Sequence, residues 1–317
     1  MPRNKKDLLA LLAALAVLLG IAIASLPSYS QGKSTAANQP QAAKDQNQSG
    51  SKSVTPKEPQ GPLSVNSTAS PAFVSAALQN ATLRTNLDWV FGGKQQHGWY
   101  LYTPLICGMI GTEKDPATED FAQALSRWQQ AAGLVPSGIL DTETWYRIVQ
   151  TLQDRRSKDH TYPPSDQLLM APPSDFYIPE RPAALRQVER QAYAAYKRMV
   201  AAAAADPSLK LAVTSTGELA PSEKFLKIVS AFRSREYQEQ LRRQSPNAGR
   251  AGLAVNSPHF TGRAMDLYVG GDPVDTSDFN RAIQTSTPVY KWLVKNAEKF
   301  GFYPYYYEPW HWEYQPQ

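Results

Sequence analysis

The sequence of 317 residues contains a single cysteine, Cys107, and only four histidines. A single thiol cannot form an intramolecular disulfide framework, and it cannot build the cysteine-rich, four-ligand site that is typical of structural zinc. We find no glycine-rich loop that could bind phosphates and no basic patch interleaved with aromatic residues. The net charge of +5 comes from scattered lysines and arginines, which are usually solvated. We therefore expect no nucleic-acid partner.

Charge is absent from Leu8 to Leu26, directly after a short basic flank. The run is about as long as the roughly 20 residues that span a bilayer, and it predicts export with the basic flank left in the cytoplasm. Ala22-Ile23-Ala24 resembles a signal-peptidase site. Residues 1–26 are therefore either a membrane anchor or a cleaved signal peptide, and the length of the run favours the anchor.

Aromatic residues are absent between Tyr29 and Phe73. Residues 27–72 consist mostly of Ser, Gln, Asn, Ala, Lys and Pro, and such a segment cannot bury enough apolar surface to become ordered. It predicts a disordered linker between residues 1–26 and the rest of the chain.

Two histidines and a carboxylate stand out in the C-terminal part of the chain: His259, Asp266 and His311. Gly262 lets the backbone turn between the first two, so that both side chains can converge on one point. The alternation after this turn predicts a strand that carries Asp266 on the face opposite to its core residues. Two imidazoles and one carboxylate leave a fourth position open, as in catalytic zinc sites. We therefore expect one Zn²⁺ ion here.

These residues lie in the patterns S-x-H-x-x-G-x-A-x-D, which begins at Ser257, and E-x-W-H, which begins at Glu308. Both patterns resemble the VanY-type zinc D-alanyl-D-alanine carboxypeptidases with their dipeptidase and endolysin relatives, over residues 175–317. The resemblance implies that the two histidines and the aspartate bind zinc and that Glu308 is the general base. It also implies a catalytic role for Arg233 in the pattern R-S-x-x-x-Q, which ends at Gln238. Ser257 and Gln238 are expected to contact the substrate or to support these groups.

Spacing alone leaves the general base open. Residues three apart on a straight strand face opposite sides, so Glu308 needs a bend at the following proline to lie beside His311. Glu313 follows His311 by two residues and shares its face, which makes it the rival base or a partner of the metal ligand. Arg235 similarly rivals Arg233, although it is expected on the exposed side of a helix.

Residues 73–153 predict a small helical domain. Apolar spacing predicts a helix from Thr118 to Gly133, and Asp141 is expected to cap a second helix from Thr142 to Leu152. The segment is similar to peptidoglycan-binding helical domains with the pattern A-x-x-x-F-Q-x-x-x-G-L-x-x-x-G-x-x-D-x-x-T, in which Trp128 here replaces the phenylalanine. The resemblance implies wall binding, and a helical bundle without a ligand is the alternative. The flanking linkers predict that this domain folds alone.

Residues 154–180 are rich in proline and predict a stiff linker, and residues 181–317 predict the catalytic domain. Its expected helices are 181–205, a helix capped by Ser234 that carries Gln238, and 288–300, and its expected strands are 211–213, 225–232 and 302–312. The expected fold class is therefore α+β, with an antiparallel sheet flanked by helices behind a small all-α domain and an N-terminal anchor or signal peptide.

The resemblance implies a metallopeptidase that removes the terminal D-alanine from peptidoglycan stem peptides. Cleavage between L-Ala and D-Glu, as in the endolysin relatives, stays open because both reactions use one metal site. The export signal argues against a cytoplasmic-type dipeptidase, and the intact ligands argue against a non-catalytic wall-binding protein. We expect a monomer in the periplasm or cell envelope, with peptidoglycan and the membrane as partners. His97 and His160 lie outside the catalytic part and are expected at the surface.

Overall fold

The computed structural model describes residues 71–245 and 253–316. The expected anchor or signal peptide at 1–26 lies outside these residues, as does the expected linker at 27–72 apart from its last two positions. Within the described part of the chain, no helix has the length and apolar character that crossing a membrane requires.

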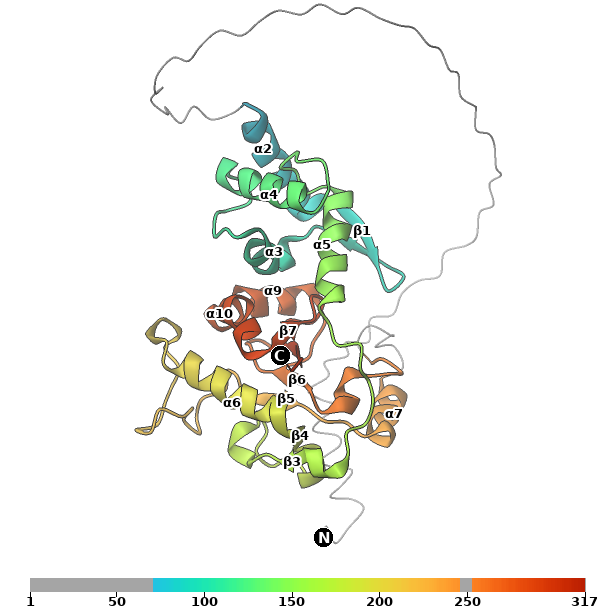
Figure 1. Ribbon diagram of the computed structural model, residues 1–317, viewed down its shortest axis with the longest axis vertical. Helices are drawn as coiled ribbons and strands as arrows, with labels where there is room; N and C mark the ends of the chain where they lie inside the picture. Colours follow the sequence, from blue (N-terminus) through green and yellow to red (C-terminus); the bar gives the residue numbers. More distant parts are fainter. Residues whose placement is uncertain (1–70, 246–252, 317) are drawn as a thin grey trace, which may run out of the picture. The chain divides into compact units, whose positions relative to one another are not determined.

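Helices and one hairpin form the N-terminal domain (Figure 1), namely α2 (Pro71–Asn86), β1 (Asp88–Phe91), β2 (Lys94–His97), the 3₁₀ helix η1 (Tyr100–Tyr102), α3 (Thr103–Ile110), α4 (Glu119–Ala131) and α5 (Thr142–Asp154). The Thr118 side chain accepts a hydrogen bond from the Phe121 backbone nitrogen, and Asp141 accepts one from Thr144. These caps satisfy amide groups that have no partner inside the helix. The two helices expected in this domain are confirmed.

The hairpin β1–β2 is missing from the sequence-based predictions. Its turn is Gly92-Gly93, and both residues have positive φ angles of 58° and 78°. Two-residue turns of this kind need such angles, and glycine adopts them without strain. The Gly-Gly dipeptide was therefore a usable signal for a hairpin, and the turn places Phe91 opposite Lys94.

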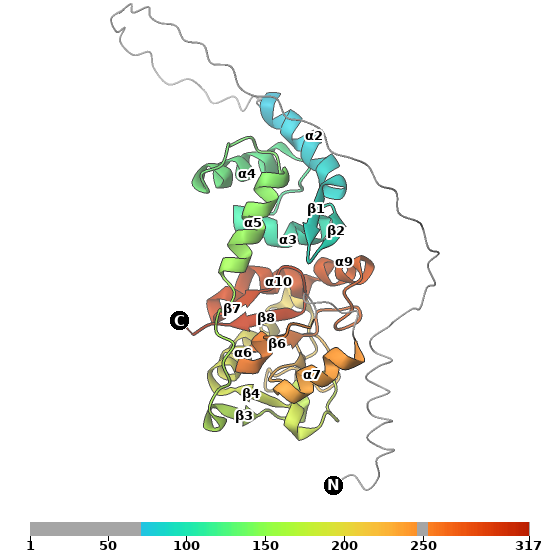
Figure 2. The same ribbon diagram turned by 90° about the vertical axis from the view of Figure 1, so that its right-hand side faces the viewer.

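A four-stranded antiparallel sheet in the order β5-β6-β8-β7 supports the C-terminal domain, and Figure 2 shows β6, β8 and β7 in succession. The strands are β5 (Ile228–Ser230), β6 (Ala264–Leu267), β7 (Phe302–Pro304) and β8 (His311–Tyr314). Its described α-helices are α6 (Arg190–Ala204), α7 (Arg235–Gln244), α9 (Asp278–Ser286) and α10 (Pro288–Asn296). The 3₁₀ helices η5 (Pro207–Leu209) and η7 (Pro258–Thr261) lie between them, and η8 (Ala297–Phe300) follows α10. The mixture of helices and antiparallel sheet behind a mainly helical domain agrees with the predicted α+β class. The prediction of an all-α N-terminal domain is wrong, because that domain contains the hairpin β1–β2.

Several predicted elements differ in extent. The helix expected at 181–205 begins only at Arg190, because Glu189 accepts a hydrogen bond from the Ala192 nitrogen as the N-terminal cap, and the residues before it form η4 (Ala183–Leu185) and β4 (Gln187–Glu189). The strand expected at 225–232 shrinks to β5, since Leu226 has a φ of 65° that interrupts extended backbone. The strand expected at 211–213 is a single bridge between Val213 and Leu219. The strand expected at 302–312 is two strands, β7 and β8, joined by a turn.

The proline-rich segment 154–180 also differs from the predicted linker. It contains η2 (Ser165–Gln167), β3 (Leu168–Met170) and η3 (Pro173–Asp175), and β3 pairs with β4. Ala171 and Phe176 are buried in the core of the C-terminal domain. The second half of this segment is therefore part of that domain.

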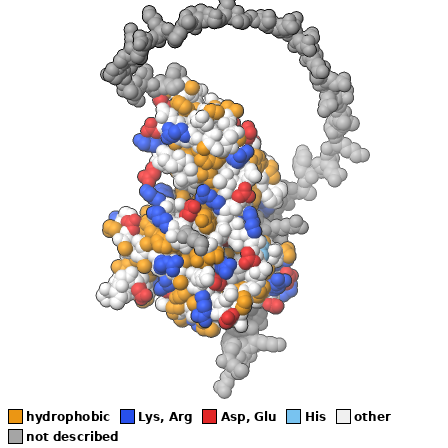
Figure 3. Space-filling view, in the orientation of Figure 1, with side chains coloured by type: hydrophobic (Ala, Val, Ile, Leu, Met, Phe, Trp, Pro, Cys, Tyr) orange, Lys and Arg blue, Asp and Glu red, His pale blue; other side chains and the backbone are white. Residues whose placement is uncertain are grey.

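Two hydrophobic clusters form the core. In the first, Met265 and Leu267 of β6 pack with side chains of α6 and α10, among them Met199 and Leu293. The second cluster fills the helical domain and also includes Tyr305 and Tyr306, from the turn between β7 and β8. The helical domain therefore shares its core with the C-terminal domain. At the surface, basic and acidic side chains alternate across the face shown in Figure 3, as expected for scattered charges.

Candidate metal centre

Three buried side chains converge from separate elements: His259 on η7, Asp266 on β6 and His311 on β8. Each offers one ligand atom, and these atoms all lie within 4.8 Å of one another. Asp266 and His311 are direct partners in the antiparallel pairing of β6 with β8. Side chains of directly opposite residues lie on the same face of a sheet, so the strand register itself brings these two groups together.

The local backbone places His259 against that face. The Ser257 hydroxyl accepts a hydrogen bond from the His259 backbone nitrogen and caps η7. Gly262 ends this turn with a φ of 68°, and a Cβ atom there would come within 3.0 Å of the Glu189 backbone nitrogen and of a Leu168 methyl group. A side chain at this position would be both strained and overpacked.

In each histidine, one ring nitrogen contacts a carbonyl or carboxylate oxygen outside the ligand group. His259 Nδ1 lies 2.7 Å from the Ala231 carbonyl oxygen, and His311 Nε2 lies 3.1 Å from Glu313 Oε1. The other nitrogens, His259 Nε2 and His311 Nδ1, lie 3.3 Å and 2.9 Å from Asp266 Oδ1. Metal-binding histidines usually have a carbonyl or carboxylate on the non-ligating nitrogen. The donor set and its supporting contacts therefore fit a zinc ion.

Arg233 holds the other oxygen of Asp266. Its Nη2 donates to Asp266 Oδ2 over 2.5 Å, its Nε donates to Ser230 Oγ over 2.9 Å, and its Nη1 lies 3.4 Å from Gln238 Oε1. Gln238 is itself fixed, since its Nε2 donates to the Ala254 carbonyl oxygen over 3.0 Å. The structure therefore brings Arg233 and Gln238 to the site, where they orient the carboxylate.

Burial and charge set the pKa values of His259 and Asp266. Burial, together with the Arg233 charge, lowers the pKa of His259 to about 4, so its imidazole is neutral and can act as a ligand. Burial alone would raise the pKa of Asp266, but its interactions with His259 and with the Arg233 charge, together with the hydrogen bonds from His259 and His311, outweigh burial and hold that pKa well below its usual range. Asp266 is therefore a carboxylate at neutral pH.

Glu308 sits in the turn between β7 and β8. The Glu308 nitrogen donates to the Tyr305 carbonyl oxygen over 3.2 Å, and the His311 nitrogen donates to the Glu308 carbonyl oxygen over 2.9 Å. This turn supplies the bend that a base at this position needs. Burial raises the pKa of Glu308 to about 7, while the His311 charge lowers it and the Asp266 charge raises it. Among the described residues, no hydrogen bond or ion pair engages its carboxylate.

Glu313 has the opposite environment. Its Oε1 accepts hydrogen bonds from Arg156 Nη2 over 2.6 Å and Nε over 3.0 Å, and its Oε2 accepts one from the Ser157 nitrogen over 2.9 Å. Burial would raise the pKa of Glu313, but the hydrogen bond and charge of His311 and the Arg156 charge outweigh it and lower the pKa to about 2. Both oxygens are therefore occupied, and the residue is arranged as a partner of His311.

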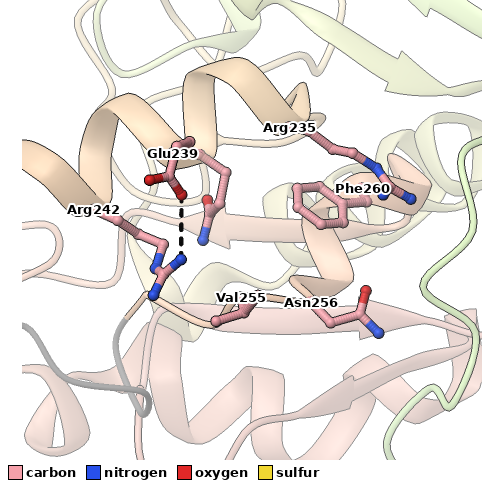
Figure 4. A pocket seen from close by; sticks show the side chains of 7 residues that line it. Arg235, Glu239, Arg242, Val255, Asn256 and Phe260 are labelled. Atoms are coloured by element: carbon pink, nitrogen blue, oxygen red, sulfur yellow. Dashed lines mark hydrogen bonds and ion pairs between the residues drawn. The ribbon is translucent and has the colours of Figure 1, made fainter.

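A pocket of about 490 Å³ is lined by Arg235, Gln238, Glu239, Arg242, Val255, Asn256 and Phe260. It is linked to the centre through Gln238, which contacts Arg233, and through Phe260, which follows His259 in the chain. Figure 4 shows Arg235, Glu239 and Arg242 along α7, with Val255 and Asn256 on the opposite wall. The Arg235 guanidinium lies 5.6 Å from the centroid of Phe260 and 5.3 Å from that of Tyr162. Arg235 is exposed, as predicted, but it also lines this pocket.

The other two histidines lie outside the candidate metal centre, and one residue that contacts this centre was not predicted from the sequence. His97 is exposed and pairs with Asp88 over 2.7 Å, and neither it nor His160 belongs to the ligand group. Sequence reasoning missed Arg156, which reaches Glu313 from a position 157 residues earlier. A contact over such a separation leaves no local signal in the sequence.

A buried His-Asp-His group beside an unpaired glutamate is the kind of centre that metal-dependent hydrolases use. Residues 185–317 match the family model of the VanY D-alanyl-D-alanine carboxypeptidases, and residues 102–148 match that of the putative peptidoglycan binding domain. The C-terminal domain is thus a VanY-type metallopeptidase domain, and a peptidoglycan-binding domain precedes it. Both families are those expected from the motifs. No curated protein matches the chain.

Proposed function

We propose that the D-alanyl-D-alanine carboxypeptidase domain uses one zinc ion, held by His259, Asp266 and His311, to remove the terminal D-alanine from peptidoglycan stem peptides. The observation that carries this proposal is the convergence of these three side chains, whose ligand atoms all lie within 4.8 Å of one another. The buried Glu308 carboxylate interacts electrostatically with two of them, His311 and Asp266. When bound, zinc supplies a Lewis acid that acidifies water and polarises a carbonyl group. The contacts of both imidazoles favour this role, because each ring has one nitrogen fixed by a carbonyl or carboxylate oxygen and turns its other nitrogen toward Asp266 Oδ1.

Glu308 is the general base in this proposal. Its carboxylate accepts a proton from the attacking water and passes it to the leaving amine. A buried carboxylate without a hydrogen-bond partner is suited to this task, because no competing donor has to be displaced. Glu313 is unsuited to it, since its two oxygens already accept hydrogen bonds from Arg156 and Ser157.

Arg233 has two roles in this proposal. Its contact with Asp266 Oδ2 keeps that side chain ionised and fixes which oxygen faces the imidazoles. Its buried positive charge also lowers the energy of the oxyanion that forms when the scissile carbonyl is attacked. Ser257 positions His259, because its hydroxyl accepts a hydrogen bond from the His259 backbone nitrogen at the start of η7.

The pocket along α7 favours a peptide longer than two residues. Its volume of about 490 Å³ and its position next to Gln238 give room for the part of a stem peptide away from the reacting bond. Arg235 offers this peptide a carboxylate-binding group. These features argue against a dipeptidase, as does the peptidoglycan-binding domain.

Mass spectrometry of a stem pentapeptide, incubated with the zinc-loaded full chain, tests this function. The expected product is the tetrapeptide that has lost one D-alanine, and Glu308→Gln protein is the matched control. Cleavage between L-Ala and D-Glu instead would assign the domain to the endopeptidase alternative. We further propose that the enzyme acts in the periplasm or cell envelope, which its two peptidoglycan-directed domains favour. In this proposal it is a monomer with residues 1–26 as its membrane anchor.

A further inference from the structure

We propose that the peptidoglycan-binding domain is a structural part of the peptidase site, because it holds both the turn that carries Glu308 and the carboxylate that orients His311. This inference rests on the proposed roles of those two residues. Two separate sets of contacts carry it, and each reaches a different catalytic group.

The first set begins at Arg156, the second residue after the end of α5. Its Nη1 lies 3.2 Å from Gln153 Oε1 on that helix, so the guanidinium is tied to the helical domain. Its Nη2 and Nε contact Glu313 Oε1, which in turn lies 3.1 Å from His311 Nε2. A buried carboxylate of this kind sets the orientation of the imidazole and its strength as a ligand. Arg156 is therefore a positioning residue for the metal centre.

The second set holds the turn between β7 and β8. The Tyr306 ring lies 5.3 Å from Phe91 and 5.6 Å from Tyr102, and the Tyr307 ring lies 4.5 Å from Phe91. Both partners belong to the helical domain, and Tyr306 is completely enclosed in its core. Glu308 follows directly in the chain, so these rings fix where its carboxylate lies.

A buried arginine reinforces the same junction from α9. Arg281 Nη1 donates to the Tyr102 hydroxyl over 3.0 Å and to the Tyr307 carbonyl oxygen over 3.3 Å, and its guanidinium lies 4.3 Å from the Tyr307 ring centroid. A hydrogen-bonded, buried cation of this kind is costly to displace. The turn is thus held by the helical domain and by α9 together.

Loss of the first set of contacts should affect zinc binding, and loss of the second set should affect turnover. Loss of the Arg156 contact frees Glu313 and should weaken metal binding, because His311 is a ligand. Loss of the ring contact at Phe91 should misplace Glu308 and slow turnover with little effect on metal binding, because Glu308 is not a ligand. A misplacement of about 1 Å at a reacting group can cost about 100-fold in rate.

The test measures zinc affinity, by competition with a chromophoric chelator, and kcat for four full-length variants. Arg156→Ala should weaken zinc binding by about 10- to 100-fold. Its control, Arg155→Ala, removes a neighbouring exposed arginine whose ion pair with Glu298 is at the surface and should leave affinity within about twofold. Phe91→Ala should lower kcat by about 10-fold or more at saturating zinc, while Val90→Ala, on the exposed side of the same strand, should not.

Zinc affinity is read without substrate, so the first comparison stands even if the proposed reaction is wrong. Near-UV circular dichroism of each variant establishes that it is folded at the assay temperature. The inference is wrong if Arg156→Ala and Arg155→Ala have the same zinc affinity, or if Phe91→Ala and Val90→Ala have the same kcat. In either case the helical domain does not support the peptidase site. If Phe91→Ala is unfolded, Arg156→Ala alone decides.

Discussion

Replacing Glu308 by glutamine removes the proposed base and leaves the metal ligands in place. Glutamine has nearly the same size and can still form hydrogen bonds, but it cannot accept the proton of the attacking water. The carboxylate lies in a buried environment that raises its pKa to about 7, so the folded protein holds the charged form at a cost that a neutral amide does not have. The variant should therefore be at least as stable as the wild type.

General-base catalysis contributes about 10²- to 10⁴-fold to the rates of enzymes. We therefore expect Glu308→Gln to lower kcat by at least about 100-fold, which corresponds to about 2.7 kcal/mol of activation free energy. Zinc affinity should stay within about twofold of the wild type, because Glu308 is not one of the three ligand residues. Release of D-alanine from a stem pentapeptide measures kcat, and chelator competition measures zinc affinity.

Glu313→Gln is the matched comparison, because it makes the same chemical change five residues later in the chain. The Glu313 carboxylate contacts His311 Nε2 and accepts a hydrogen bond from Arg156 Nη2. Zinc affinity should therefore fall by about 10- to 100-fold in Glu313→Gln, and most of the activity should return at saturating zinc. The reasoning fails if Glu313→Gln abolishes turnover with zinc bound and Glu308→Gln leaves it nearly intact. The base would then be Glu313.

Other variants test the ligands, the turn and the pocket. The double variant His259→Ala, His311→Ala should lose the stoichiometric zinc that metal analysis finds in the wild type, and zinc retained there would place the metal elsewhere. Gly262→Ala should lower the free energy of unfolding by about 2 kcal/mol, measured by urea denaturation, because its φ of 68° and its close contacts leave no room for Cβ. Arg235→Ala should raise KM about fivefold without changing kcat. Arg243→Ala changes an arginine outside the pocket and should alter neither constant. Equal KM values for the two variants would show that the pocket does not bind the substrate.

The grouping of the three candidate ligands was largely predictable from sequence because residue type and motif spacing are local signals. Residue type and the spacing around Gly262 bring His259 and Asp266 together, and the register of β6 with β8 then adds His311. The position of Glu308 was not predictable, since a straight strand from 302 to 312 would turn its side chain away from His311. Only the turn between β7 and β8 resolves this, and that turn depends on rings from another domain.

The boundaries of the catalytic domain were the weaker part of the prediction. Short strands such as β3 and β4, each of three residues, give too little alternation to identify. The prolines of the segment 154–180 indicated a linker, yet Phe176 forms a bridge with Ile228 of the sheet and is buried. Proline restricts the backbone without deciding whether its neighbours are solvated or packed.

The shared core has a consequence for the order of folding. Tyr102 contacts Arg281 across 179 residues of sequence, and Tyr305 and Tyr306 complete a cluster that otherwise comes from residues 87–152. Contacts between distant parts of a chain form slowly, because a long loop must close first. The N-terminal domain therefore emerges first, but Tyr102 and Trp145 lack their contacts with Tyr306 until the turn between β7 and β8 arrives. The base and the last aromatic side chains of that cluster thus reach their places in the same step, and the peptidase becomes competent only when the whole chain has folded.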